Sequence, residues 1–502
     1  MSKGPKAIML IIRPPCLFAP SPLLRILLLL PLFLIISITV TTPVSANHGF
    51  FSLKYKFAGQ KRSLAALKAH DNSRQLRILA GVDLPLGGTG RPEAVGLYYA
   101  KIGIGTPARD YYVQVDTGSD IMWVNCIQCN ECPKKSSLGM ELTLYDIKES
   151  LTGKLVSCDQ DFCYAINGGP PSYCIANMSC SYTEIYADGS SSFGYFVRDI
   201  VQYDQVSGDL ETTSANGSVI FGCSATQSGD LSSEEALDGI LGFGKSNTSM
   251  ISQLASSGKV RKMFAHCLDG LNGGGIFAIG HIVQPKVNTT PLVPNQTHYN
   301  VNMKAVEVGG YFLNLPTDVF DVGDKKGTII DSGTTLAYLP EVVYDQLLSK
   351  IFSWQSDLKV HTIHDQFTCF QYSGSLDDGF PAVTFHFENS LYLKVHPHEY
   401  LFSYDGLWCI GWQNSGMQSR DRRNITLLGD LALSNKLVLY DLENQVIGWT
   451  EYNCSSSIKV VDEQSGTVHL VGSHYISSAC SLSTRSAIIM LLLTTMLYTL
   501  VY

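Results

Sequence analysis

The stretch "VQVDTGSD", residues 113–120, decides the fold. Apolar residues alternate up to Asp116, which predicts a strand with one buried face, and the Thr117-Gly118 pair then turns the chain sharply. A buried carboxylate without a partner is costly, because water no longer solvates its charge. We therefore expect a partner for Asp116 elsewhere in the chain.

A second carboxylate stands in the same setting at "GTIIDSGTT", residues 327–335. There a β-branched strand runs into Asp331, so that Asp-Thr-Gly-Ser and Asp-Ser-Gly-Thr form a matched pair. Each is followed by an apolar run containing glycine, "DGILGFG" at 238–244 and "ITLLGDL" at 425–431. An internal repeat of this kind predicts two lobes of like design, each contributing one carboxylate.

Two carboxyl groups in contact cannot both ionise comfortably, so they share one proton and can act as base and acid at once. As base the pair takes a proton from water, and as acid it protonates the carbonyl oxygen of a peptide bond. Gly118 and Gly333 allow the tight turns that bring backbone N–H groups toward the carboxylates. This chemistry requires no cofactor, no metal and no covalent intermediate.

Four segments resemble the pepsin-like aspartic proteases in their order along the chain: "VDTGSDIMWV", "IYADGSSSFG", "DGILGFG" and "IIDSGTTLAYLP". The resemblance runs from about residue 97 to residue 454. It implies a mostly β, bilobal fold with the active site in the cleft between two related β-lobes. The cysteine-rich insert resembles that of the plant nepenthesin-type branch, and the apolar tail resembles its GPI-anchored members. The insert contains Cys158, Cys163, Cys174 and Cys180.

The resemblance also assigns roles to residues. Asp116 and Asp331 would be the catalytic dyad. The supporting residues would be two hydroxyls that bridge the lobes (Thr117 and Ser332), two hydroxyls that bond outward to the aspartates (Ser119 and Thr334), and the two turn glycines, Gly118 and Gly333.

The segment "EIYADGSSSFGYF" would be a flap, a β-hairpin that turns at Asp188-Gly189 and closes over the substrate. Tyr186 lies at the position of the family's flap tyrosine, and Trp123 matches the tryptophan that pairs with it. The alternative for Tyr186 is an ordinary strand aromatic. The Asp-Gly pair two residues later favours the functional role.

One residue departs from the family pattern. Asp120 stands where many members have Ser or Thr, and an extra acid close to the dyad would raise its pKa values and move the pH optimum upward. Alternation along the chain instead points Asp120 to the opposite face from Ser119. The effect on the dyad is a hypothesis.

The cysteines indicate an oxidising compartment. Of 14 cysteines, Cys16 and Cys480 lie near the ends, and the 12 in the body are an even number. The run "CIQCNEC" has a spacing that metal sites also use, but no second cluster follows it at ligand spacing, so we expect disulfides and no metal. The resemblance implies the pairs Cys369–Cys409 and Cys267–Cys454.

Seven Asn-X-Ser/Thr sequons predict a glycosylated surface. The one at Asn453 is doubtful because Cys454 is expected to be bonded. The other six are Asn177, Asn216, Asn247, Asn288, Asn295 and Asn424.

The N-terminal part predicts processing. Residues 1–46 contain a long apolar run before "VSA" and are typical of a secretory signal peptide, a retained signal anchor being the alternative. Residues 47–80 hold seven Lys/Arg against one acid. Such a segment before an acidic body indicates a propeptide that covers the cleft of a zymogen, or else a basic helix or linker.

The C-terminal part predicts an anchor. After lobes at 81–295 and 296–455 we expect a polar stalk at 456–478 and a GPI signal at 479–502 that is removed, with Ser477 as the attachment candidate. A short membrane helix is the alternative. These features place the protein at the extracellular face of the plasma membrane, or in the apoplast or vacuole.

Charge narrows the functional classes. Residues 81–502 hold 25 Lys/Arg against 43 Asp/Glu, which argues against nucleic acid as a partner. We expect a monomeric aspartic endopeptidase that hydrolyses proteins or peptides at acid pH. The alternative is a catalytically inactive binding or inhibitor protein of the same fold, and both aspartates favour catalysis. An adhesion role would need no dyad.

Overall fold

The computed structural model describes residues 80–92, 96–170, 173–175, 178–233, 235–323, 325–364, 366–418, 424–463 and 465–476. The chain divides into two units, Met1–Leu67 and Lys68–Tyr502, and the described residues all belong to the second. The predicted signal peptide, nearly all of the predicted propeptide, the GPI signal, Asn177 and Ser477 lie outside them. Within the described ranges, no helix is both long and apolar enough to cross a membrane.

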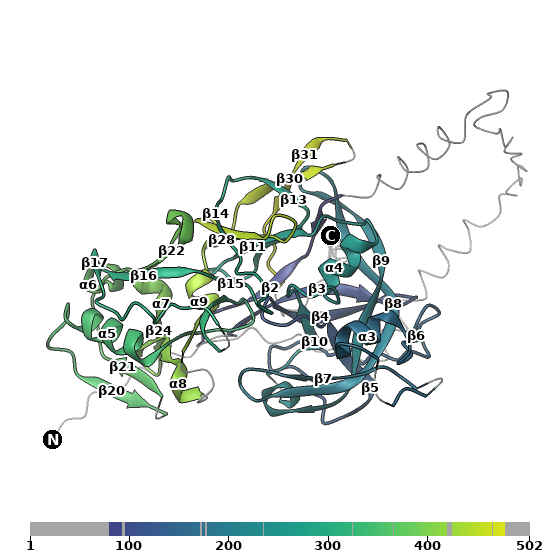
Figure 1. The fold of residues 1–502 in the computed structure, drawn as a ribbon, viewed down its shortest axis with the longest axis horizontal. Helices are drawn as coiled ribbons and strands as arrows, with labels where there is room; N and C mark the ends of the chain where they lie inside the picture. Colours follow the sequence, from purple (N-terminus) through teal and green to yellow (C-terminus); the bar gives the residue numbers. More distant parts are fainter. Residues whose placement is uncertain are drawn as a thin grey trace, which may run out of the picture. The chain divides into compact units, whose positions relative to one another are not determined.

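The described chain is mostly β, as the sequence predicts, and its largest sheet has 15 strands (Figure 1). Alternating apolar residues give some of its strands one buried face, as in β4, where Val113 and Val115 are buried. The strands of this sheet are β1 (Val82–Asp83), β2 (Leu86–Thr89), β3 (Leu97–Ile104), β4 (Arg109–Asp116), β5 (Trp123–Asn130), β6 (Lys154–Leu155), β7 (Ser181–Ile185), β8 (Ser191–Gly208), β9 (Glu211–Ser228), β10 (Gly239–Gly242), β11 (Met263–Leu268), β12 (Gly275–Ile279), β14 (Asn288–Pro291), β28 (Lys436–Asp441) and β29 (Val446–Glu451).

Residues 300–428 build three smaller sheets, green in Figure 1. One has five strands: β15 (Asn300–Val301), β18 (Gly327–Ile330), β19 (Ala337–Leu339), β26 (Trp412–Asn414) and β27 (Ile425–Leu428). Two have four strands each: β16 (Met303–Val308), β17 (Tyr311–Phe312), β22 (Val383–Phe387) and β23 (Tyr392–Val395), and then β20 (Val360–Ile363), β21 (Phe367–Phe370), β24 (Leu401–Tyr404) and β25 (Leu407–Ile410).

Helices are short. The longest described helix is α5 (Glu341–Phe352), which buries Val343, Leu347 and Ile351 at the i, i+4, i+8 spacing of one helix face. The other described helices are α3 (Asp161–Asn167), α4 (Met250–Ser256), α6 (Leu376–Gly379), α7 (Pro397–Tyr400), α8 (Ser415–Gln418) and α9 (Asp430–Leu433).

The two sequence repeats have the same strand topology. In the first lobe β10 runs parallel to β4, with Gly242 opposite Asp116. In the second lobe β27 runs parallel to β18, and Ile330 pairs with Leu428 immediately before Asp331. In both lobes the glycine-containing apolar run lies beside the strand that leads to the carboxylate, and this fixes both aspartates at strand ends.

Strands of the large sheet come from both sides of the predicted lobe boundary at 295/296. β28 and β29 come late in the chain, yet β28 pairs with β11 and joins the large sheet, so the two halves share strands. Pairing of this kind protects an exposed strand edge. The shared region is packed with aromatic rings: Phe264 stacks on Tyr440 at 4.4 Å between ring centroids, and Tyr299 lies 4.7 Å from Tyr440.

The polar stalk predicted at 456–478 is wrong for its described residues. β30 (Ser457–Asp462) and β31 (Thr467–Gly472) form an antiparallel hairpin that pairs with β13 (His281–Gln284). Ile458, Val460 and Val471 are buried against the body. Their alternation is a strand signal that the polar composition of the segment masked.

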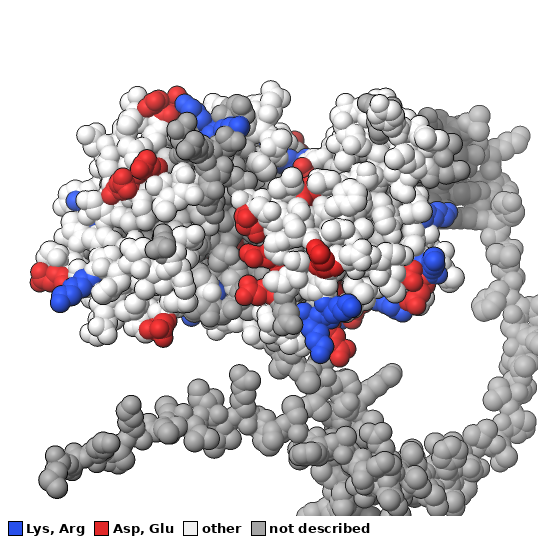
Figure 2. Space-filling model, turned by 90° about the horizontal axis from the view of Figure 1, so that it is seen from below, with Lys and Arg blue, Asp and Glu red and all other residues white. Residues whose placement is uncertain are grey.

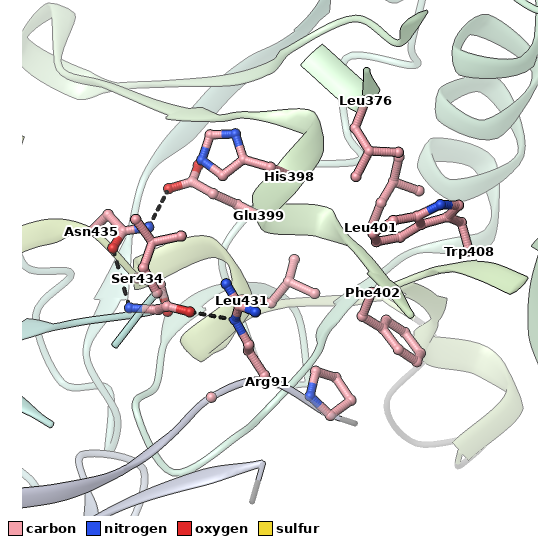
Figure 3. A pocket seen from close by; sticks show the side chains of 14 residues that line it. Arg91, Leu376, His398, Glu399, Leu401, Phe402, Trp408, Leu431, Ser434 and Asn435 are labelled. Atoms are coloured by element: carbon pink, nitrogen blue, oxygen red, sulfur yellow. Dashed lines mark hydrogen bonds between the residues drawn. The ribbon is translucent and has the colours of Figure 1, made fainter. Parts of the chain in front are cut away.

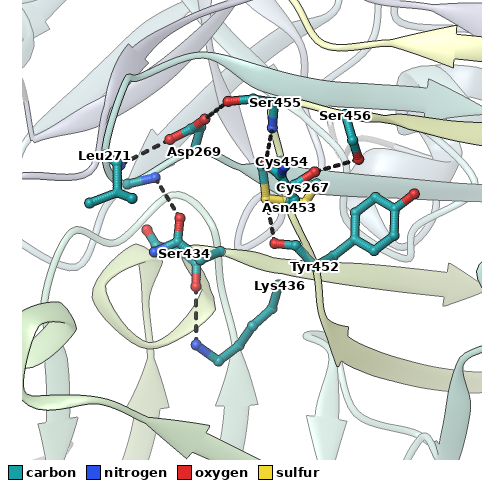
Figure 4. Close-up of a disulfide and its surroundings, with 12 residues drawn as sticks. Cys267, Asp269, Leu271, Ser434, Lys436, Tyr452, Asn453, Cys454, Ser455 and Ser456 are labelled. Atoms are coloured by element: carbon teal, nitrogen blue, oxygen red, sulfur yellow. Dashed lines mark hydrogen bonds between the residues drawn. A yellow bond between two sulfur atoms is a disulfide. The ribbon is translucent and has the colours of Figure 1, made fainter.

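Six disulfides staple the described chain, and they include both pairs that the resemblance implied. Figure 4 shows Cys267–Cys454, which joins β11 to the residues that follow β29. All three cysteines of "CIQCNEC" are bonded. The six are Cys126–Cys223, Cys129–Cys132, Cys158–Cys174, Cys163–Cys180, Cys267–Cys454 and Cys369–Cys409.

Candidate active site

Asp116 ends β4, Asp331 follows β18, and the two turns face each other. A Cβ atom added at Gly118 would lie 2.6 Å from Oδ1 of Asp331, and one added at Gly333 would collide with the carboxylate of Asp116. The turn glycines are therefore required for a close approach as well as for the turn itself. Both carboxylates are buried, with exposed fractions of 6% and 8%.

Each carboxylate accepts two hydrogen bonds from its own turn. The Gly118 N–H donates to Oδ1 of Asp116 at 2.7 Å, and Ser119 Oγ donates to Oδ2 at 2.5 Å. The second turn repeats this arrangement: the Gly333 N–H donates to Oδ1 of Asp331, and Thr334 Oγ1 donates to Oδ2, both at 2.8 Å. These bonds fix the orientation of both carboxyl groups.

Of the two hydroxyls predicted to bridge the lobes, only that of Thr117 makes a contact between them. The Ser332 N–H donates to Thr117 Oγ1 at 2.9 Å, whereas Ser332 Oγ has no hydrogen-bond partner in the described part of the chain. Two further contacts cross between the turns and were not expected from the sequence. Gln114 Nε2 donates to the Gly333 carbonyl at 3.3 Å, and His298 Nδ1 lies 2.9 Å from the Gly118 carbonyl oxygen.

Burial raises the pKa of Asp116 to about 7, and the neighbouring charge of Asp331 adds to the effect. Hydrogen bonds from Ser119 and Gly118 act in the opposite direction because they stabilise the ionised form. The pair thus retains a proton at acid pH.

A third carboxyl group lies close to the dyad. Asp430, at the start of α9, is buried, and its Oδ1 has no hydrogen-bond partner among the described residues. Burial raises its pKa well above the usual value, and the charges of Asp331 and Asp116 add to this. Sequence reasoning assigned it no role, although it follows directly the glycine of "ITLLGDL".

The flap is a hairpin of β7 and the start of β8, in which Ile185 pairs with Ser191. Its tip turns at Gly189, which has a φ of 87°, and the Asp188 carboxylate accepts hydrogen bonds from Ser190 N–H at 2.9 Å and Oγ at 2.8 Å. Both features match the Asp-Gly turn expected from the sequence.

Tyr186 packs against the cluster of buried residues that contains Trp123. Trp123 Nε1 donates to Tyr186 Oη at 2.6 Å, which is the pairing that the resemblance implied. Burial raises the pKa of Tyr186 well above its usual value, and the charge of Asp116 is the next largest cause. The structure therefore brings the flap tyrosine, the tryptophan and the first aspartate together.

Asp120 is held by a neighbouring loop. Its Oδ1 accepts a hydrogen bond from the Ser246 N–H at 2.8 Å. Its charge acts on Glu184 in β7, whose pKa burial and Asp120 together raise to about 7. The largest effects on Asp116 come from its own burial and Asp331. An influence of Asp120 on the dyad stays a prediction.

A separate cavity of about 170 Å³ lies where residues 90–92 and 270–271 meet the second lobe (Figure 3). Arg91, Glu399, Leu431 and Asn435 are among its lining residues, whereas the two dyad aspartates and Tyr186 are not. Its polar groups bind one another: Arg91 Nε donates to the Gly270 carbonyl at 2.5 Å, and Asn435 Nδ2 lies 3.5 Å from Glu399 Oε1. It is a junction where the N-terminal segment packs on the second lobe.

The described sequon asparagines are all exposed: Asn216, Asn247, Asn288, Asn295, Asn424 and Asn453. Cys454 is bonded to Cys267, the condition that made Asn453 doubtful.

The sequence of this chain is similar to family models and to known proteins. Two family models, described as xylanase inhibitor N-terminal and xylanase inhibitor C-terminal, match residues 98–281 and 298–451. Aspartic proteinase 36 of Arabidopsis thaliana is 49% identical over 460 residues, which are 91% of this chain and 94% of that protein. The chain belongs to the plant aspartic proteinase family. Aspartic proteinase 39 of the same species is 49% identical over 451 residues, 89% of this chain and 94% of that protein.

Solved structures agree on the fold. The crystal structure of conglutin gamma, a unique basic 7S globulin from lupine seeds, has a TM-score of 0.59 at 19% identity and covers 75% of this chain and 96% of that chain. The predicted bilobal, pepsin-like β fold is thus confirmed. The two matched family regions correspond to the two repeats, and both end before β30.

Proposed function

We propose that this plant aspartic proteinase is an endopeptidase that hydrolyses peptide bonds with Asp116 and Asp331 as a shared-proton dyad. The observation that supports it best is the pair of facing turns, in which each buried carboxylate accepts one hydroxyl and one backbone N–H. With the turns in contact, both acids would reach one water molecule held between them.

The dyad works as base and acid in one step. The ionised carboxyl takes a proton from the water, which attacks the carbonyl carbon of the peptide bond, while the protonated carboxyl donates to the carbonyl oxygen. This needs one shared proton. Because burial and Asp331 raise the pKa of Asp116 to about 7, the proton is present at acid pH and is lost as the pH rises through that value. We therefore propose an acid optimum.

The flap provides closure over the substrate. The hydrogen bond from Trp123 to Tyr186 holds the hairpin in a defined position. Closure excludes water and strengthens the electrostatic contacts of the dyad. Peptides or proteins with apolar side chains on both sides of the cut are the expected substrates.

The competing function is an inactive binding or inhibitor protein, and it has support in the description of the matched family models. A protein that only binds has no need of two buried, hydrogen-bonded acids in contact, since their mutual repulsion is costly. Catalysis is therefore the favoured function.

The processing and the cellular location of the protein are also part of this proposal. A signal peptide, a GPI anchor and glycans would place a monomeric enzyme at the cell surface, and the paired cysteines Cys158–Cys174 and Cys163–Cys180 support a nepenthesin-type insert. Figure 2 shows Asp and Glu side chains both in the middle and at the rim of the face that it views, with Lys and Arg mainly toward the rim. The excess of acids over bases in residues 81–502 suits a basic propeptide at 47–80.

The decisive experiment is peptide cleavage by the secreted protein between pH 3 and pH 7, with and without pepstatin, beside Asp116→Asn. Acid-dependent cleavage that the inhibitor blocks and the substitution abolishes is the expected result. Asp345→Asn, an exposed acid on α5, is the matched control and should retain activity. Absence of cleavage after verified removal of residues 47–80 favours the binding protein instead.

A further inference from the structure

The segment after β29 lies outside both matched family regions and is packed against the start of the described chain. We call residues 457–476 the C-terminal clamp; their described part comprises β30, β31 and the strand-like end at 473–476. It contacts the N-terminal segment, residues 81–90, at several points.

The residues directly before the clamp are fixed covalently. Cys454 is bonded to Cys267 in β11, and next to it Ser455 Oγ donates to Asp269 Oδ2 at 2.5 Å (Figure 4). Arg261 Nε and Glu463 Oε1 form an ion pair at 2.7 Å farther along. The clamp therefore starts from a rigid point on the body.

The middle of the clamp covers the first residues of the N-terminal segment. Val460 is buried in a cluster with Val206, Ile458 and Val471. A Cβ atom added at Gly81 would lie 2.7 Å from Val460, so backbone and clamp are in close contact there. The Gly81 carbonyl accepts from the Val206 N–H at 2.8 Å.

The end of the clamp binds the same segment by its backbone and by one ion pair. The Ile476 N–H donates to the Leu86 carbonyl at 2.9 Å, and Tyr99 Oη donates to the Ile476 carbonyl at 2.9 Å. His474 Nε2 lies 2.8 Å from Oδ2 of Asp83 in β1. Asp83 is buried, and the side chain of His474 is one-third exposed.

The N-terminal segment leads from the clamp to the floor of the candidate active site. A Cβ atom added at Gly90 would lie 2.9 Å from Cβ of Asp430, so the segment packs on α9. The Asp430 N–H donates to the Thr334 carbonyl at 2.7 Å, and Thr334 Oγ1 in turn holds Asp331.

We propose that the C-terminal clamp holds the N-terminal segment against the floor of the active site, with the His474–Asp83 ion pair as a lock that closes in acid. His474 and Asp83 act as positioning residues, because neither touches the reacting atoms. The expected partner of the clamp is thus the chain's own N-terminal segment.

The pH dependence of the lock follows from the groups around His474. The hydrogen bond to Asp83 raises the pKa of His474, partial burial lowers it, and the charges of Asp83 and Asp204 raise it further. Lys101 in β3 is the cation that faces Asp204. A histidine whose pKa is higher in the folded state stabilises the fold below its unfolded pKa of about 6.5, and this stabilisation is lost as the pH rises through the folded pKa.

The test is hydrogen exchange of the amides of residues 82–88 in the secreted protein made from the full chain, compared with His474→Gln at the same pH. At pH 5.5 the substitution should speed exchange about twofold to fivefold, the effect of a partly exposed ion pair. At pH 8.5, far above the ordinary pKa of histidine, the two proteins should exchange alike. The measurement needs no peptidase activity, so it fails or succeeds independently of the proposed function.

Two further variants make the result decisive. His469→Gln is the matched control, because His469 lies in the same clamp but its carboxylate neighbour Asp209 is 3.9 Å away and exposed. Asp83→Asn should reproduce the effect of His474→Gln, and the double variant should add nothing to it. Unchanged exchange at pH 5.5, an equal effect at both pH values, or an equal effect of His469→Gln would overturn the proposal.

Discussion

At the scale of single residues, the dyad depends on the hydroxyls beside it. Ser119 Oγ donates to the Asp116 carboxylate and lowers its pKa, which partly offsets burial and the charge of Asp331. We expect Ser119→Ala to reduce kcat/KM about tenfold to a hundredfold, the range for a hydrogen bond to a charged group. It should also move the loss of activity on the basic side to higher pH, because the pKa of Asp116 rises further.

A pH profile of kcat/KM checks both parts of this prediction. Ser119→Thr keeps a hydroxyl at the same position and should restore much of the activity. A basic limb that stays in place while activity falls would mean that Ser119 acts on the substrate or on the fold, and not on the proton of the dyad.

At the scale of elements, the flap depends on one indole N–H. Trp123→Phe removes the donor to Tyr186 Oη and should lower kcat/KM about fivefold, the effect of one ordinary hydrogen bond, mainly by raising KM. Steady-state kinetics with a fluorogenic peptide measures this. Trp412→Phe is the control, because Trp412 Nε1 has no hydrogen-bond partner in the described chain. Equal changes in KM for both variants would argue against the flap contact.

The elements differ in how far the sequence predicts them. β4 and β18, with their glycine-containing partners β10 and β27, follow from local patterns: alternation, a terminal acid, and a repeat of both. β28 joins the sheet of the other lobe, and β30 pairs with β13, through contacts between residues far apart in the chain. Local periodicity carries no information on such partners.

The same limit applies to the site. The motif predicts Asp116, Asp331 and their hydrogen-bond donors, because these lie within three residues of one another in each turn. It does not predict Asp430, whose special character comes from tertiary burial beside both carboxylates. An Asp after a glycine is common, and only packing makes this one unusual.

At the scale of the whole molecule, one buried ion pair connects the shared sheet to the second lobe. Lys436 Nζ in β28 lies 2.9 Å from Oε1 of Glu399 in α7, and their side chains are 2% and 4% exposed. Such a pair adds little net stability over apolar residues, but removing one partner leaves a buried charge uncompensated.

Glu399→Gln should therefore lower the free energy of unfolding by about 3–5 kcal/mol, measured by urea denaturation at pH 6. The double variant Glu399→Gln/Lys436→Met removes both charges and should recover most of the loss. If the single substitution had little effect, water would have to reach Lys436 in the folded protein.

Because β28 also pairs with β11 of the first lobe, the loss of stability in Glu399→Gln should appear in one cooperative unfolding transition of both lobes. Two separate transitions would mean that the shared sheet does not couple the lobes.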